Sequence, residues 1–163
     1  MSADDYEVVT PPTTVRGKVS FGADGVDVDM LEKAEAVIAS MQGNYLEWVQ
    51  DDLKKIQGFY EQAVADEAGR QTHLEHVFEA AHDIKGQGGS FDYPLMTVIG
   101  TLLCRYLERL GATGTADLNV VKLHIDAMRL VIGSRMRGDG GRMGSNIIQG
   151  LDAVLAKVAA RGA

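Results

Sequence analysis

The chain of 163 residues is poor in cysteine, in proline and in basic charge, and each shortage narrows what the protein can be. Its single cysteine, Cys104, has no second thiol with which to form an intramolecular disulfide. No window approaches about 18 uninterrupted apolar residues, and residues 1–5 show no apolar segment of a secretory signal. Sixteen basic residues against 23 acidic ones give a net charge of −7, which argues against nucleic acid or an anionic membrane as a partner. We therefore expect a cytoplasmic protein.

Proline and glycine mark the organisation of the chain. Pro11 and Pro12 lie near the start, and Pro94 is the one other proline, so long helices can form on both sides of it. Glycine is abundant, with 19 of 163 residues against a usual share of about 7%. Turn-forming residues punctuate residues 1–26 too often for a helix. We expect these to form a mobile tail or a short extended strip, followed by one domain over residues 27–163.

The spacing of apolar residues predicts helices and no convincing strand. Helices are expected over residues 29–41, 45–67, 71–91, 94–110 and 117–136, and from Ser145 onward. Asp29, Asp117 and Ser145 have side chains suited to helix caps. Gly43 and Asn44 are expected to break or kink the chain between the first two helices. The pattern therefore predicts an all-α bundle.

Residues 71–91 form the helix whose chemistry is most specific. At about 100° per residue, the apolar side chains cluster on one face, which comprises Leu74, Val77, Ala80, Ala81, Ile84, Gly88 and Phe91. The residues within about 60° of His82 on the opposite face are Glu75, Phe78, Glu79, Lys85, Gly86 and Gly89. Most histidines in helical proteins are structural or merely solvated. This one differs because glycines follow it one and two turns later on the same face.

Three glycines after His82 destabilise this helix and need a physical reason. Each glycine in a helix interior costs about 1 kcal/mol relative to alanine. Close helix packing accounts for Gly88 on the core face, but Gly86 and Gly89 lie on the outward face. We predict that they leave room for another protein to reach the imidazole, and that Lys85 supplies a positive charge for an anion. An arrangement of this kind suits transient phosphorylation of a histidine nitrogen, in which positioning and charge neutralisation carry most of the catalysis.

A known family signature matches residues 81–91, which read AHDIKGQGGSF. The run resembles the His-x-x-Lys-Gly motif of histidine-containing phosphotransfer (HPt) domains. Its Ile84, Gly89, Ser90 and Phe91 also resemble the amino-terminal phosphotransfer domain of chemotaxis histidine kinases. The motif covers about 15 residues, and the apolar pattern of the next helix extends the likeness through Leu95, Ile99, Leu103 and Leu107.

The resemblance implies an antiparallel four-helix bundle, and we expect an additional helix at the N-terminus, at the C-terminus or at both. It makes His82 the phosphorylated residue and Lys85 its electrostatic aid. Phe78, Glu79, Gly86 and Gly89 would then form the surface on which a partner docks. The expected partners are receiver domains of response regulators or of a hybrid histidine kinase, which supply Mg²⁺ and the acidic catalytic residues.

The chain departs from the family pattern at two positions. Many HPt domains have glycine ten residues after the histidine, where this chain has Asp92. Family members often place Gln or Glu 22 residues after the histidine to orient the imidazole, and the ungapped count reaches Cys104. Chemotaxis kinases use Glu there, so the difference favours a carrier that is separate from a kinase. A thiol is a poor substitute for an amide or carboxylate as a hydrogen-bonding partner.

Other polar clusters allow competing interpretations. His73 and His82 lie about 180° apart on one helix, so we expect no metal site. His124 is expected to be structural or solvated. Residues 133–144 contain five glycines and three arginines (Arg135, Arg137 and Arg142), and they form either a flexible loop or a basic arm that contacts an acidic receiver.

The sequence therefore predicts a phosphocarrier that relays a phosphoryl group between receiver aspartates through His82. We expect a monomer without a cofactor of its own, and no kinase or ATP-binding domain within these residues. The alternative is an unphosphorylated, degenerate HPt-like module that uses the same face to sequester a response regulator.

Overall fold

All regular structure is helical in the residues that the computed structural model describes, which are 28–110 and 118–161. The α-helices are α1 (Val28–Ala65), α2 (Arg70–Gly88), α3 (Pro94–Leu110), α4 (Leu118–Gly133) and α5 (Gly141–Arg161), and a short 3₁₀ turn, η2 (Gly89–Phe91), follows α2. No strand occurs within these ranges, so the predicted all-α class is confirmed. The extension predicted for residues 1–26 and the cap predicted at Asp117 lie outside the described residues.

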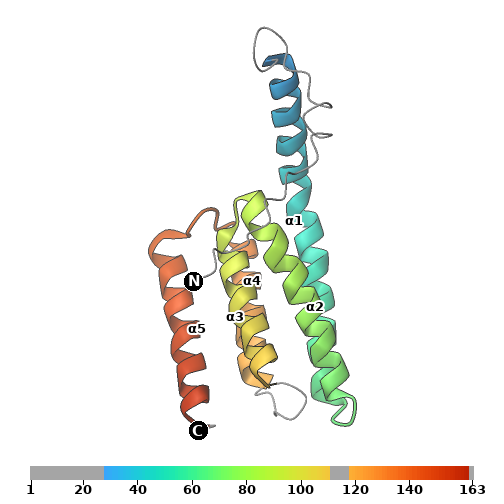
Figure 1. Ribbon diagram of the computed structural model, residues 1–163, viewed down its shortest axis with the longest axis vertical. Helices are drawn as coiled ribbons and strands as arrows, with labels where there is room; N and C mark the ends of the chain where they lie inside the picture. The colour runs from blue at the N-terminus through green and yellow to red at the C-terminus, as the bar shows by residue number, and fades with distance from the viewer. Residues whose placement is uncertain (1–27, 111–117, 162–163) are drawn as a thin grey trace, which may run out of the picture. The chain divides into compact units, whose positions relative to one another are not determined.

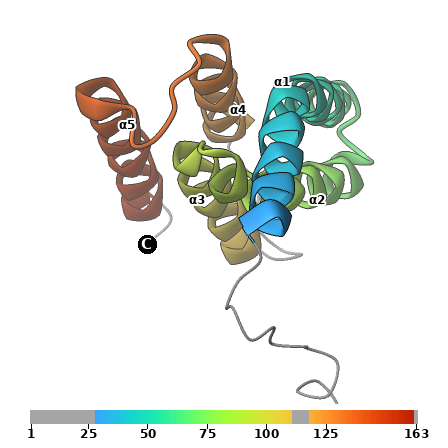
Figure 2. The ribbon, with the colours of Figure 1, turned by 90° about the horizontal axis from the view of Figure 1, so that it is seen from above.

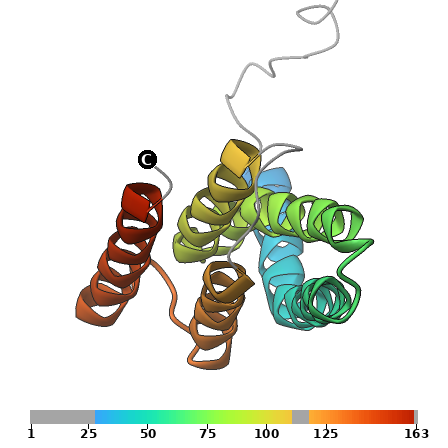
Figure 3. The same cartoon turned by 90° about the horizontal axis from the view of Figure 1, so that it is seen from below.

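The chain divides into two compact units, residues 1–40 and 41–163. In the first unit, the described residues belong to the beginning of α1. In the second unit, α1, α2, α3 and α4 lie side by side, and consecutive helices alternate in direction (Figure 1). The two end-on views show α5 on the outside of this group, where it packs against α3 and α4 (Figure 2 and Figure 3). Within the described ranges, none of the helices is both long enough and apolar enough to cross a membrane.

The core of the second unit is continuous and draws on every helix. Its α1 residues recur at helical spacing, as expected for a helix that buries one face. The largest fully buried side chains include Tyr45, Ile56, Ile84, Tyr93, Met96, Ile99, Leu103, Ile125 and Met128. Among the described residues, His124 is a polar side chain buried in this core and is 0% exposed.

An aromatic cluster covers the end of the core at which η2 lies. The Tyr45 and Phe91 rings stack with their centroids 4.5 Å apart, and Tyr93 lies 5.5 Å from Tyr45. Trp48 meets Phe91 edge-on at 6.5 Å and is 44% exposed. Such aromatic pairs add to the stability that burial alone provides. The cluster therefore ties η2 to α1.

The junction between α2 and α3 fixes the residues that follow the His82 helix. The Tyr93 N–H donates to the carbonyl of Gly88 at 2.8 Å, so a residue of the junction satisfies a carbonyl at the end of α2. Asp92 has the left-handed backbone (φ 65°) that reverses the chain, and Pro94 begins α3. Proline suits this first helical position because its missing N–H has no partner there in any case.

Three predicted boundaries are wrong. Gly43 and Asn44 do not separate two helices, because α1 is continuous from Val28 to Ala65. A single interior glycine costs only about 1 kcal/mol, which neighbouring helical residues can offset. At the other end of the chain, α4 ends at Gly133 and α5 begins at Gly141, so Ser145 lies inside α5. The connection expected over residues 133–144 is therefore shorter than predicted.

Candidate functional site

The two faces of α2 differ in burial as helical spacing predicts. Leu74, Val77, Ala81, Ile84 and Gly88 are buried against the rest of the bundle. Exposed on the opposite face are Glu75, Glu79, His82, Gly86 and Gly89, and Phe78 and Lys85 are half-buried among them. The predicted core residues Ala80 and Phe91 are also half-buried. The exposure that was predicted for His82 is thus confirmed, whereas its chemical role stays a prediction.

The imidazole of His82 lies on the surface next to one aromatic neighbour. The Phe78 ring, one turn earlier, has its centroid 6.2 Å from that of the His82 ring. The phenyl group therefore borders the imidazole on its N-terminal side. On its C-terminal side, Gly86 leaves its position on the next turn without a side chain, and Lys85 of the same turn is half-buried. A macromolecule that approaches α2 can reach the ring over this open turn.

The glycines after His82 divide into two kinds by what surrounds them. A methyl group at Gly86 would have no atom within 4 Å, and one at Gly89 would meet only the Thr97 hydroxyl at 3.8 Å. At Gly88 it would lie 2.8 Å from the Tyr93 carbonyl oxygen and 2.9 Å from Met96 Cβ. Gly88 is therefore required for helix packing. Among the described residues, nothing in the packing requires glycine at position 86, where a side chain would meet no neighbouring atom within 4 Å at its Cβ.

Helix α3 holds the backbone of the turn that carries Lys85. The Thr97 hydroxyl donates to the carbonyl oxygen of Lys85 at 2.9 Å. A methyl group at Gly100 would lie 2.9 Å from Lys85 Cβ and 3.1 Å from the Ala81 carbonyl oxygen. This contact allows little movement of Lys85 relative to α3. Sequence reasoning missed Thr97 and Gly100, although a glycine inside the apolar pattern of residues 94–110 is a signal of close helix packing.

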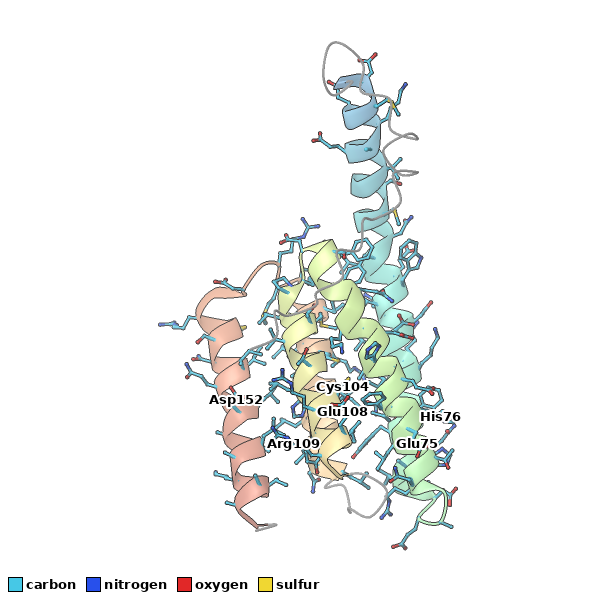
Figure 4. The ribbon with its side chains drawn as sticks, in the orientation of Figure 1. Glu75, His76, Cys104, Glu108, Arg109 and Asp152 are labelled. Atoms are coloured by element: carbon cyan, nitrogen blue, oxygen red, sulfur yellow. The ribbon has the colours of Figure 1, made fainter. Side chains whose placement is uncertain are left out.

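Cys104 is buried under α2, on the side of α3 next to that helix (Figure 4). Its Sγ lies 4.0 Å from the carbonyl oxygen of Phe78, one turn before His82. Burial raises the pKa of the Cys104 thiol, and the positive charge of Lys85 partly opposes this effect. The residue thus lies beneath the turn of α2 that precedes His82. Its predicted role in orienting the imidazole stays a prediction.

The other histidines make structural contacts. His73 Nε2 lies 3.2 Å from Asp66 Oδ2 across the α1–α2 turn, and the His76 ring packs on Phe59 with centroids 5.0 Å apart. His124 Nδ1 donates to the Val120 carbonyl at 2.8 Å inside the core. Among the described residues, no three His, Cys, Asp or Glu side chains gather at a position that suits a metal ion.

A groove lies away from His82, between α1 and α4. Its volume is about 410 Å³, and its lining comprises Gln50, Leu53, Lys54, Gln57, Gly58, Glu61, Arg129, Ile132 and Gly133. None of these residues belongs to α2. The groove is therefore separate from the exposed face of α2 that carries His82.

Comparison of the chain with models of known families, with curated proteins and with solved structures found no match.

Proposed function

We propose that this chain is an HPt phosphocarrier that moves a phosphoryl group between receiver-domain aspartates through His82. The observation that carries the proposal is the exposed imidazole on a helix face that Gly86 leaves open, with Lys85 one turn further on. In this proposal α1 to α4 form the antiparallel four-helix bundle of the family, and α5 is the additional C-terminal helix. The proposal includes a monomeric state and a cytoplasmic location.

The transfer step needs little from the carrier beyond position and charge. The lone pair of a neutral His82 ring nitrogen attacks the phosphorus of an aspartyl phosphate on the receiver. The N–P bond forms as the P–O bond to the aspartate breaks, and the aspartate leaves as a carboxylate. The proton on the other ring nitrogen is then free to pass to water. Because the transition state is loose, the Lys85 charge and the receiver's Mg²⁺ supply most of the stabilisation. The carrier therefore needs no cofactor of its own and is not a kinase.

The backbone at Asp92 supports the family assignment despite the change of residue. Asp92 occupies the position at which many HPt domains have glycine, and its φ of 65° and ψ of 31° are left-handed. Glycine adopts this conformation most easily, and aspartate is among the residues that tolerate it. The departure therefore changes the side chain at this position while keeping the conformation for which glycine is suited.

A second candidate function is a degenerate module that binds a receiver without accepting phosphate. The observation that favours it is the contact of Cys104 Sγ with the Phe78 carbonyl at 4.0 Å. A thiol is a weak hydrogen-bond donor, so a residue at this position orients the imidazole less firmly than Gln or Glu would. Receiver binding would persist on the same face of α2.

Phosphate transfer from a prelabelled receiver separates these functions. Receiver domains of the source organism are phosphorylated with labelled acetyl phosphate, freed of excess donor and mixed with the chain. We expect acid-labile, base-stable label on the wild type and none on His82→Gln. The melting temperature should hardly change, because surface substitutions alter stability by no more than about 0.5 kcal/mol. His73→Gln, on the same helix, is the control that should keep its label.

Two results would reject the carrier function at His82. Undiminished labelling of His82→Gln would move the phosphorylated site elsewhere. Receiver binding by the wild type without any label would establish the sequestering module instead.

A further inference from the structure

The end of α2 that follows His82 is rich in glycine. Gly86 and Gly88 belong to α2, and Gly89 directly follows it. After proline, glycine is the residue least favourable to the interior of a helix. The turn that begins just after His82 therefore has little helical stability of its own and depends on contacts with the rest of the chain.

Two residues beyond α2 satisfy carbonyl groups of this turn. The carbonyls of the last four residues of a helix, here 85–88, have no partner within the helix itself. The Thr97 hydroxyl donates to the Lys85 carbonyl oxygen at 2.9 Å, and the Tyr93 N–H donates to that of Gly88 at 2.8 Å. The turn is therefore held by a side chain of α3 and by the backbone of the junction before it.

The Thr97 hydroxyl reaches its acceptor through space that a larger residue would fill. A methyl group at Gly88 would lie 2.9 Å from this hydroxyl oxygen, and one at Gly89 would lie 3.8 Å from it. Thr97 itself is half-buried and lies in the first turns of α3. Gly88 therefore leaves room for the hydroxyl that holds the turn.

The Lys85 side chain begins between α2 and α3. A methyl group at Gly100 would lie 2.9 Å from Lys85 Cβ, so the stem starts against the backbone of α3. Long side chains of a helix lean toward its N-terminal end. Burial raises the pKa of the Cys104 thiol, and the Lys85 charge partly opposes this rise. Because Cys104 Sγ lies 4.0 Å from the Phe78 carbonyl oxygen, the stem runs back toward the turn of His82 (Figure 4).

We propose that Thr97 is a positioning residue for phosphoryl transfer, which keeps the last turn of α2 helical and thereby holds Lys85 beside His82. The inference rests on the proposed function, because Lys85 has this task only if His82 accepts a phosphoryl group. Residues at i and i+3 are neighbours on a helix, so the two side chains adjoin only while this turn is helical. Without the Thr97 bond, the glycines would let the turn open for part of the time and move the Lys85 charge away.

Substitutions at Thr97 isolate the effect of its hydroxyl on the turn. Thr97→Val removes the hydroxyl while nearly keeping the shape, Thr97→Ala removes it with a smaller side chain, and Thr97→Ser keeps it. Thr101→Val is the matched control, because the Thr101 hydroxyl donates to the Thr97 carbonyl within α3 at 2.7 Å. Amide hydrogen exchange of residues 86–89 is followed by NMR. We expect about fivefold faster exchange in the valine and alanine variants of Thr97, and changes of less than about twofold in the other two.

Labelling by phosphoramidate tests whether Thr97 acts through Lys85. In this reaction a ring nitrogen of His82 attacks phosphorus, the N–P bond of phosphoramidate breaks, and ammonia leaves. We expect about threefold slower labelling in Thr97→Val and a nearly unchanged rate in Thr97→Ser and Thr101→Val. In a Lys85→Gln background, Thr97→Val should cause no further slowing, because no charge is left to position.

Several results would overturn the inference. These are unchanged amide exchange or unchanged labelling in Thr97→Val, equal effects of Thr101→Val, and equal slowing by Thr97→Val with and without Lys85. A wild type that takes label from neither phosphoramidate nor receivers would instead reject the carrier function, and with it any role of Thr97 in transfer. Amide exchange needs no phosphoryl chemistry, so it would still decide whether Thr97 holds the turn.

Discussion

On α2 and α3, one glycine leaves the surface beside His82 open to a partner, and another allows the two helices to pack closely. Gly86 faces open surface, whereas Gly100 brings α3 against the backbone of Ala81 and Lys85. Replacing glycine should therefore change the free energy of unfolding in opposite directions at these two positions, both of which lie near Lys85. Substitutions at these positions measure the two roles separately.

At Gly86, a larger side chain should stabilise the fold and impair docking. Because a methyl group there meets no atom within 4 Å, Gly86→Ala should raise the free energy of unfolding by up to about 1 kcal/mol. Gly86→Gln should also keep the fold, but its side chain would cover the approach to His82. Urea unfolding and a receiver titration measure the two effects. A less stable Gly86→Gln variant that binds normally would contradict the open-surface interpretation.

At Gly100, the same change to alanine should destabilise the protein. Its added methyl group would lie 2.9 Å from Lys85 Cβ and 3.1 Å from a backbone carbonyl, so the helices must separate slightly. We expect a loss of about 1–3 kcal/mol, as for other overpacked sites. Urea unfolding alongside Gly86→Ala checks the prediction, since helix propensity alone would stabilise both variants.

Cys104 offers a test of how the imidazole is oriented. If the residue acts on His82 from α3, Cys104→Gln should introduce the stronger hydrogen-bonding group and change the lifetime of phosphohistidine or the transfer rate. Cys104→Ser should alter both only slightly. Single-turnover labelling of the three proteins gives the comparison. Identical kinetics for the glutamine variant and the wild type would exclude an orienting role for this position.

At the scale of whole elements, sequence patterns predicted the helices better than their ends. Pro94 fixed the beginning of α3 correctly because proline strongly prefers the first turn. The beginning of α5 was not predicted correctly. The Asp139 carboxylate, and not the Ser145 hydroxyl, accepts the N–H of Gly141, the first residue of that helix. The exposed face of α2 followed from spacing alone. The contacts of Thr97 and Gly100 with Lys85 did not, since they depend on how closely two helices approach.

The end of α4 provides a prediction about helix termination. After α4, the Arg135 N–H donates to the Ile132 carbonyl and the Met136 N–H to the Val131 carbonyl, which together form a Schellman motif. Arg135 occupies the left-handed position of this motif with a φ of 51°. That conformation costs a non-glycine residue about 1 kcal/mol, so the free energy of unfolding of Arg135→Gly should exceed by about that amount that of a variant in which glycine relieves no strain. Arg137→Gly is the control, because Arg137 is not among the positive-φ residues and glycine there only adds freedom to the unfolded chain. Equal effects of both substitutions on the urea midpoint would rule out relief of backbone strain.

For the molecule as a whole, the fully buried His124 couples stability to pH. Burial lowers the pKa of His124, while its bond to the Val120 carbonyl and the negative charge of Asp152 on α5 partly oppose this shift. The unfolded chain therefore binds a proton at a higher pH than the folded protein does. Stability contributed by neutral His124 is fully present above about pH 6.5 and is lost as the pH falls below that value.

Global unfolding measured between pH 7 and pH 5 should show this loss directly. We expect the free energy of unfolding to fall by about 1–2 kcal/mol over that interval, since each pH unit across the titration is worth up to about 1.4 kcal/mol. His124→Leu removes the titrating group and should flatten the profile, whatever its effect on stability at pH 7. An unchanged slope in this variant would show that other groups carry the pH dependence.

Because Trp48 contacts Phe91 edge-on, the tryptophan fluorescence of the unmodified chain can report docking at this end of the molecule. Trp48 is the single tryptophan of the sequence, so selectively excited emission comes from one indole. That indole is 44% exposed and contacts η2, the segment that directly follows the His82 helix. A partner that covers this end would exclude water from the indole, shift its emission to shorter wavelength and shield it from iodide quenching. Docking and its salt dependence are thereby open to measurement in solution, without a dye and without altering any residue near His82.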